Sequence, residues 1–217
     1  MEPDRFFSQA DLDAIQAAVR EAEARTSGEI VPYVVERSDP YQNAIWKGAA
    51  LGALLGPMVA LAIYRWTDVW GWPPEFWIAL PAPLGGAAGY LLALLQPVRR
   101  WMAGEHVLDL RARRRAAGAF LEQEVFHTRN RTGILLFVSL FERRVVLLAD
   151  SGIHQKVEEG AWEAITRKLA AGIRSGRPGP ALIEAIRACG ELLERHGVEI
   201  QADDTDELSD ELRRERE

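Results

Sequence analysis

Two long uncharged stretches divide the chain and constrain its fold more than any other feature of the sequence. Neither Gly48–Tyr64 nor Phe76–Val98 contains a charged residue. A helix needs about 20 predominantly apolar residues to cross a bilayer. Six of the seven tryptophans, which favour membrane interfaces, cluster near the ends of these stretches. We therefore predict a two-helix transmembrane hairpin over residues 45–101.

The alternative to a membrane hairpin is a pair of buried helices in a soluble core. Several glycines and four prolines lie within the two stretches. Membrane helices tolerate these residues, whereas a soluble helical core rarely contains so many. The composition of the stretches favours the membrane.

Positive charges near the span ends predict the orientation of the hairpin. The link between the stretches carries only Arg65. The segment after the second stretch carries six arginines: Arg99, Arg100, Arg111, Arg113, Arg114 and Arg115. Positive flanks stay in the cytoplasm, where arginines can contact anionic lipid headgroups. Because no secretory signal is recognised, we expect a two-span protein of the inner (cytoplasmic) cell membrane with both termini cytoplasmic.

The charge distribution excludes one class of partner. The formal net charge is −6, and the nine acids and three arginines of Glu199–Glu217 already give 3 − 9 = −6. The rest of the chain is neutral, so we expect no nucleic acid partner. Residues 198–217 should form an acidic, mobile tail. The single cysteine, Cys189, excludes an intramolecular disulfide and lies in a helical apolar stripe, where a buried inert thiol is expected.

The segment before the hairpin predicts a helix and a strand. Residues 6–28 contain a capped helix, with Ser8 at the N-cap and Asp11 three residues later. The β-branched residues of EIVPYVVER indicate a strand, in which Pro32 favours an edge or an early position.

The segment after the hairpin completes an α/β pattern. A helix over 106–129 precedes two apolar strands, TGILLFVSL and RVVLLAD, which we expect to pair as a hairpin. Two amphipathic helices over 158–176 and 180–197 follow. This order predicts an α/β/α sandwich with an inserted two-helix transmembrane hairpin. The predicted parts are 1–44 and 102–197 for the domain, 45–101 for the hairpin and 198–217 for the tail.

Three stretches together resemble the TPM domain family: ARTSGEIVPYVVERSDPY, RTGILLFVSLFERRVVLLADSGI and WEAITRKLAAGIRSG. The family includes a thylakoid lumen acid phosphatase and a photosystem II repair protein. The chain is most similar to a bacterial branch of membrane proteins in which a two-span hairpin splits the domain. The resemblance covers about residues 6 to 197. It implies an α/β/α fold and, in some members, binding of Ca²⁺ or Mg²⁺ and phosphatase activity.

One motif of the better-known branch differs here. In that branch the last strand is followed by Gly-Tyr-Gly-Leu-Glu-Gly, whereas this chain has Asp-Ser-Gly-Ile-His-Gln at positions 150–155. The tyrosine and the glutamate are missing, so a metal site that depends on that glutamate is not implied.

Acidic residues follow each predicted strand, where loops can bring together the oxygen ligands that hard cations prefer. Asp39 follows the first strand and Glu142 the second. If the last two strands are antiparallel, Glu142 and Asp150 lie at opposite ends of the sheet. The most compact candidate metal site comprises Asp150, Ser151, His154, Glu158 and Glu159. Alternatively, Glu158 and Glu159 only stabilise the first turn of a helix.

The sequence is compatible with two functions. The common nucleotide-binding, zincin and nucleophile-elbow motifs are not present in the sequence. We therefore expect a membrane-anchored interaction or assembly module with an unidentified protein partner, with or without a bound divalent cation. The alternative is a metal-dependent phosphatase of the TPM type, in which a cation near Asp150 activates water. No catalytic residue is assigned.

Overall fold

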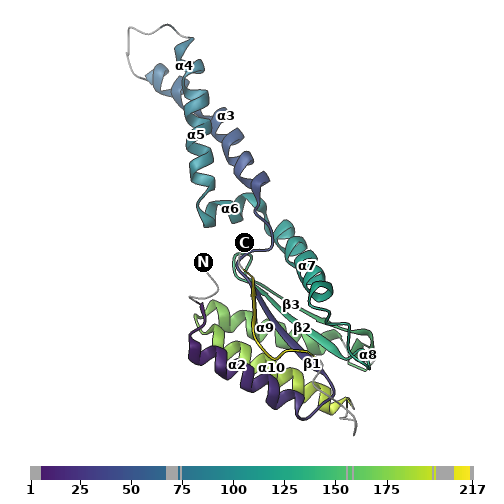
Figure 1. The fold of residues 1–217 in the computed structure, drawn as a ribbon. Coiled ribbons are helices and arrows are strands. Elements are labelled where there is room, and N and C mark those ends of the chain that lie inside the picture. The colour runs from purple at the N-terminus through teal and green to yellow at the C-terminus, as the bar shows by residue number, and fades with distance from the viewer. Residues whose placement is uncertain are drawn as a thin grey trace. The chain divides into compact units, whose positions relative to one another are not determined.

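The chain forms two compact units in the computed structural model, which describes residues 6–66, 73, 75–154, 156–157, 159–196, 198 and 208–215. Unit 1 comprises residues 1–38 and 109–217, and unit 2 comprises residues 39–108. The boundaries of unit 2 lie just outside those of the predicted hairpin. The elements, labelled as in Figure 1, are α2 (Gln9–Glu23), β1 (Glu29–Val35), α3 (Gln42–Trp66), α4 (Phe76–Ala79), α5 (Pro81–Ala93), α6 (Gln96–Ala103), α7 (Glu105–Glu122), β2 (Gly133–Ser139), β3 (Arg144–Ala149), α8 (Ser151–His154), α9 (Glu159–Arg174), α10 (Pro178–Arg195) and β4 (Arg213–Glu215).

Unit 1 has a mixed α/β fold built on a four-stranded sheet of order β3-β2-β1-β4. β1 runs parallel to β2 and β4, and β2 runs antiparallel to β3. Every residue of β1 and β2 is buried, as expected for strands that are covered on both faces. The predicted pairing of the last two strands is confirmed.

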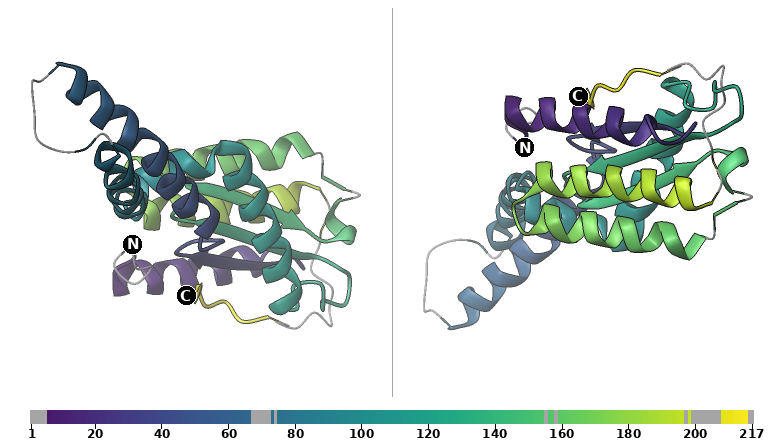
Figure 2. Two further views of the ribbon diagram at one scale, coloured as in Figure 1. Left: turned by 90° about the horizontal axis from the view of Figure 1, so that it is seen from above. Right: turned by 90° about the horizontal axis from the view of Figure 1, so that it is seen from below.

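Side chains that alternate along β1 enter two different apolar clusters. Ile30 and Val34 lie in a cluster with residues of α2, α9 and α10. Val31, Tyr33 and Val35 lie in a second cluster with alanines of α7. Figure 2 shows α2, α9 and α10 lined up over one face of the sheet. The sheet of unit 1 is therefore covered by helices on both faces.

Two local predictions in unit 1 are confirmed. Ser8 caps α2: its hydroxyl accepts a hydrogen bond from Asp11 N at 3.1 Å, and the Asp11 carboxyl accepts one from Ser8 N at 2.9 Å. Cys189 of α10 is fully buried, and burial raises the pKa of its thiol to about 12. The thiol therefore stays protonated and unreactive at neutral pH.

The second uncharged stretch, Phe76–Val98, does not form one continuous helix. The segment is divided into α4, α5 and the start of α6, with prolines at the first turns of α5 and α6. At Leu80 the break is local, because Leu80 N donates to Phe76 O and Leu84 N donates to Leu80 O. At Leu95 the backbone is extended, and the chain changes direction. Among the described residues, α3 is the one helix long and apolar enough by itself to cross a membrane.

The described part of the predicted acidic tail is folded against the rest of unit 1. Residues 213–215 form β4, and Asp210 is 7% exposed. Leu208 and Leu212 pack against the two apolar clusters on opposite faces of the sheet. The structure here differs from the expectation of a mobile end, because the segment carries leucines and paired charges that match the edge of the sheet.

Candidate functional site

Asp150 directly follows β3 and is 5% exposed. Its Oδ1 accepts a hydrogen bond from Ser151 N at 2.6 Å. Arg131 Nε lies 2.8 Å from Asp150 Oδ2, which is an ion-pair distance without the alignment of a hydrogen bond. Arg131 already supplies the positive charge beside Asp150. A divalent cation at this carboxylate would therefore compete with Arg131 for it.

The other predicted ligands are only partly described. Ser151 begins α8, and His154 ends it. The side chains of His154 and Glu159 lie outside the described structure, as does the whole of Glu158. In the described part of the chain, no group of three or more His, Cys, Asp or Glu side chains is placed to hold a metal ion. The five-residue metal site remains a prediction.

Glu142 lies at the other end of the sheet from Asp150, as the antiparallel pairing requires. Ser139 pairs with Arg144, whereas Ile134 pairs with Ala149 next to Asp150. Glu142 is fully buried, accepts a hydrogen bond from Ser38 N at 2.8 Å and accepts another from the Ser139 hydroxyl. Glu142 therefore links the segment that follows β1 to the end of β2. In the described structure this is a structural role.

The outer edge of β1 holds a network of charged groups around β4. Tyr33 Oη donates to Glu215 Oε2 at 2.8 Å, and Arg115 of α7 contacts the same carboxylate. Arg115 also donates to Glu122 at 3.0 Å and lies over the Tyr33 ring, with its guanidinium carbon 5.7 Å from the ring centroid. Burial, followed by the hydrogen bond with Glu215, raises the pKa of Tyr33. Tyr33 therefore remains a neutral donor.

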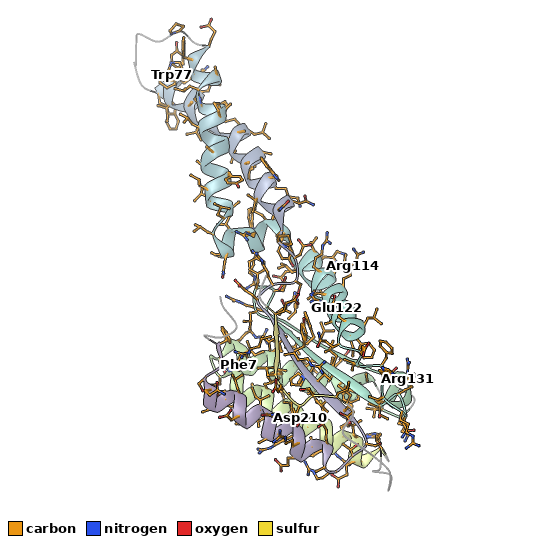
Figure 3. The ribbon with its side chains drawn as sticks, in the orientation of Figure 1. Phe7, Trp77, Arg114, Glu122, Arg131 and Asp210 are labelled. Atoms are coloured by element: carbon orange, nitrogen blue, oxygen red, sulfur yellow. The ribbon has the colours of Figure 1, made fainter. Side chains whose placement is uncertain are left out.

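A second polar cluster at this edge surrounds Glu23, the last residue of α2. Glu23 Oε1 accepts a hydrogen bond from Ile30 N at 2.8 Å. Burial, with smaller contributions from the neighbouring carboxyls of Glu29 and Asp210, raises the pKa of Glu23 from 4.5 to about 9. Arg20 Nε donates to Asp210 Oδ2 at 2.7 Å. At neutral pH Glu23 is therefore protonated, and the buried Asp210 carboxylate is paired with Arg20 (Figure 3 labels Asp210).

In unit 2, α3 and α5 approach through glycines that have no room for a side chain. A Cβ on Gly52 would lie 2.1 Å from Gly85 O, and a Cβ on Gly85 would lie 2.2 Å from Gly52 O. Gly48 and Gly56 of α3 make similar backbone approaches to α5. The glycines of α3 are four residues apart, which is the GxxxG spacing typical of packed membrane helices.

Aromatic pairs mark both ends of the α3–α5 pair. Trp46 and Tyr90 have ring centroids 5.8 Å apart, and Tyr64 and Trp77 have ring centroids 5.5 Å apart. Figure 3 shows Trp77 at the end of unit 2 away from α6. The part of α3 from Trp46 to Tyr64 corresponds to about 27 Å of helix. The apolar surface between these residues approaches the roughly 30 Å hydrocarbon thickness of a bilayer.

Arg99 of α6 binds backbone carbonyl groups at the C-terminal end of α5. Its Nη2 donates to Leu94 O at 2.9 Å, and its Nε donates to Ala93 O at 3.4 Å. α6 runs crosswise at this end of the α3–α5 pair (Figure 1). Trp101 of α6 is 74% exposed. An arginine that binds the last carbonyls of a helix satisfies acceptors that hydrocarbon could not.

Comparisons with known proteins bear on the fold alone. The chain is similar to a solved structure described as the NMR structure of the BA42 protein from the psychrophilic bacterium Bizionia argentinensis, with a TM-score of 0.60. The sequences are 17% identical, and the similarity covers 99% of each chain. No protein-family model and no curated protein matches the sequence. The fold is thus shared with a bacterial protein. Membership of the TPM domain family stays an expectation from the sequence resemblance.

We expect unit 1 to unfold more readily as pH rises from about 4.5 toward 9. The pKa of Glu23 is near 4.5 in an unfolded chain and near 9 in the fold, so folding retains a proton throughout this range and is favoured at its acidic end. The charged groups around it are Glu29, Asp210 and, through Asp210, Arg20. Hydrogen-exchange protection of the slowest-exchanging amides of unit 1 should fall by up to about tenfold per pH unit, the limit for one proton.

Glu23→Gln separates this proton from other effects of pH. A glutamine can accept from Ile30 N and donate to Asp210 without titrating. We expect its protection to be nearly independent of pH over the same range. Glu21→Gln is the matched control, because Glu21 lies two residues away, is exposed and pairs with Arg187. An equal pH slope in the wild type and Glu23→Gln would contradict the assignment.

Proposed function

We propose that the chain is a membrane-anchored interaction or assembly module, in which unit 2 is the anchor and unit 1 is the cytoplasmic domain. The observation that carries the proposal is the pairing of α3 and α5 through glycine while their leucines point outward. Leu54, Met58, Leu84 and Leu91 are between 60% and 69% exposed. A helix pair in water buries such side chains between the helices, whereas a helix pair in lipid packs through small residues.

The lengths of the two helical arms fit one bilayer. The aromatic pairs bound about 27 Å of α3. The second arm runs from Phe76 to Ala93 through the local break at Leu80, and it is nearly as long as this part of α3. Tryptophan and tyrosine at both limits favour the two interfaces. We therefore infer two spans, although α3 alone among the described helices is long enough by itself.

The positive charges support one orientation. Arg99 and Arg100 lie on α6, at the end of the hairpin where the chain enters and leaves it, while Arg65 lies at the other end. The positive-inside rule places the α6 end in the cytoplasm of an inner-membrane protein, together with both termini. The exposed Trp101 beside these arginines suits the headgroup region of the cytoplasmic leaflet.

The proposed role of unit 1 is to bind a protein partner near the membrane. This role is supported by the outer edge of β1, which already pairs with an extended segment, β4. In the described residues, Asp150 is engaged with Ser151 and Arg131, and no contact favours the alternative of a metal-dependent phosphatase. Binding of Ca²⁺ or Mg²⁺ is not required for the proposed role.

Single cysteines on a Cys189→Ala background test the anchor and its orientation. In intact cells, a membrane-impermeant maleimide should label Glu75→Cys, which follows the link between the spans, and should not label Ser175→Cys in unit 1. Leu54→Cys, in the middle of α3, should stay unlabelled even after permeabilisation. Permeabilised cells are the control and should label Ser175→Cys. Labelling of Ser175→Cys in intact cells would overturn the orientation, and rapid labelling of Leu54→Cys would overturn the span.

A further inference from the structure

The outer edge of β1 is open to another strand along only part of its length. Alternate residues of a strand point their backbone groups to opposite sides, and Glu29 N donates toward Thr132 on the β2 side. Ile30 N points to the outer side and donates to Glu23. Pro32, the next outward residue, has no N–H. The edge therefore presents a strand-binding segment at Tyr33–Val35, which is where β4 pairs.

The contacts that hold the chain's own tail at this segment combine strand pairing, apolar packing and two ion pairs. In the described part of the chain, three residue pairs join β4 to β1. Before the strand, Asp210 pairs with Arg20, and at the end of the strand the Glu215 side chain contacts Tyr33 and Arg115. The residues of the bound segment that face the rest of unit 1 are therefore an acid, Asp210, then Leu212, then a second acid, Glu215.

Two cationic side chains at this edge each bind an acid of the docked tail: Arg115 contacts Glu215, and Arg20 contacts Asp210. Arg115 is held in place by Glu122 and by the Tyr33 ring, and its side chain is 18% exposed. A preorganised, partly buried guanidinium binds a carboxylate more strongly than an exposed one does. Arg20 at the other end is 65% exposed. Arg115 should therefore contribute most of the selectivity and Arg20 the smaller part.

The tail is attached so that it can leave this edge without unfolding the helices. α10 ends at Arg195 and β4 begins at Arg213, so a long connection separates the two elements. Removal of a three-residue edge strand leaves β1 paired with β2 along its whole length. A short edge strand at the end of a long connection can open locally while the rest of the fold stays intact.

We propose that the Tyr33–Val35 edge is a docking site for an extended segment of a partner protein that carries acids at the positions of Asp210 and Glu215, and that the chain's own tail occupies this site until a partner displaces it. The proposal rests on the function of unit 1 as an interaction module and names its contact surface. Addition of a strand to a sheet edge supplies affinity through backbone hydrogen bonds, and the Arg115 contact supplies specificity.

A synthetic peptide of residues 208–215, LSDELRRE, with a fluorescent label tests the site in detergent. Anisotropy should show saturable binding to a chain that ends at residue 207, and at least tenfold weaker binding to the full chain, whose tail competes. Arg115→Ala in the shortened chain should weaken peptide binding at least tenfold. Arg113→Ala is the matched control, because Arg113 lies on the same helix and contacts Asp109. That control should bind the peptide normally.

The result that would overturn the proposal is a folded shortened chain that does not bind the peptide, or a full chain that binds it equally well. A stable dimer of the full chain with exchanged tails would also overturn the role of a separate partner. If the shortened chain does not fold, Glu215→Gln in the full chain replaces it and should increase peptide binding at least tenfold. Since the assay needs no membrane, its failure leaves the cysteine-labelling test of the anchor intact.

Discussion

Gly85→Ala is expected to separate α3 from α5 and to lower the stability of unit 2 by about 1–3 kcal/mol, the usual cost of inserting a methyl group where none fits. The added Cβ would lie 2.2 Å from the Gly52 carbonyl oxygen and 3.1 Å from Gly56 Cα. Because these are backbone atoms of a helix, no side-chain rotation relieves the overlap. Titration of the detergent-solubilised chain with SDS, followed by helical circular dichroism, should show an earlier loss of structure.

Gly86→Ala is the matched control for this prediction. Gly86 is the next residue on the same helix, but its Cβ would meet Ala53 Cβ at 3.4 Å, which is close to ordinary van der Waals contact. Both variants change helix propensity equally, since each replaces a glycine by alanine. Equal SDS midpoints for the two variants would contradict the packing of α3 against α5.

The elements of unit 1 could be predicted because their signals are local. The capping pair of α2, the continuous apolar run of β2 and the short turn to β3 each specify one structure within a few residues. The position of Pro32 was informative too, because it marks the part of β1 that β4 does not pair with. The antiparallel pairing of β2 and β3 then placed Asp150 and Glu142 at opposite ends of the sheet.

The features of unit 2 that the prediction missed depend on contacts between distant residues. The spacing of Gly48, Gly52 and Gly56 was available in the sequence as a GxxxG pattern, and it would have indicated the packing face of α3. The breaks in the second uncharged stretch were signalled by Pro81 and Pro97, which lie in the first turns of new helices. Composition and length alone could not locate these breaks.

The polar cluster at the β1 edge could not be predicted from local patterns. Glu23 and Asp210 lie near opposite ends of the sequence, and each resembles an ordinary surface acid. The tail was expected to be mobile because its net charge is high. In the structure, Leu212 packs against the apolar cluster that contains residues of α2, α9 and α10, and Glu215 contacts Arg115. The mutual placement of such groups follows only from the tertiary fold.

Glu142→Ala is expected to lower the free energy of unfolding of unit 1 by roughly 3 kcal/mol. This carboxyl accepts hydrogen bonds from Ser38 N and from the Ser139 hydroxyl, and hydrogen bonds to carboxylates contribute about 1.5–3 kcal/mol each. The truncation also leaves a cavity at a fully buried position. Pulse proteolysis along a urea titration in mild detergent measures the change, since it reports the fraction of unit 1 that is unfolded.

Glu142→Gln distinguishes loss of the hydrogen bonds from loss of the side chain's volume. The amide has nearly the same shape and keeps an oxygen for Ser38 N, while the Ser139 hydroxyl can turn to accept from the amide nitrogen. We therefore expect it to retain most of the stability that Glu142→Ala loses. If both variants were as stable as the wild type, the link between the end of β1 and the end of β2 would not depend on this carboxyl. If both lost stability equally, the site would require a carboxylate, and the charge on Glu142 would be the feature that holds the chain where it leaves β1.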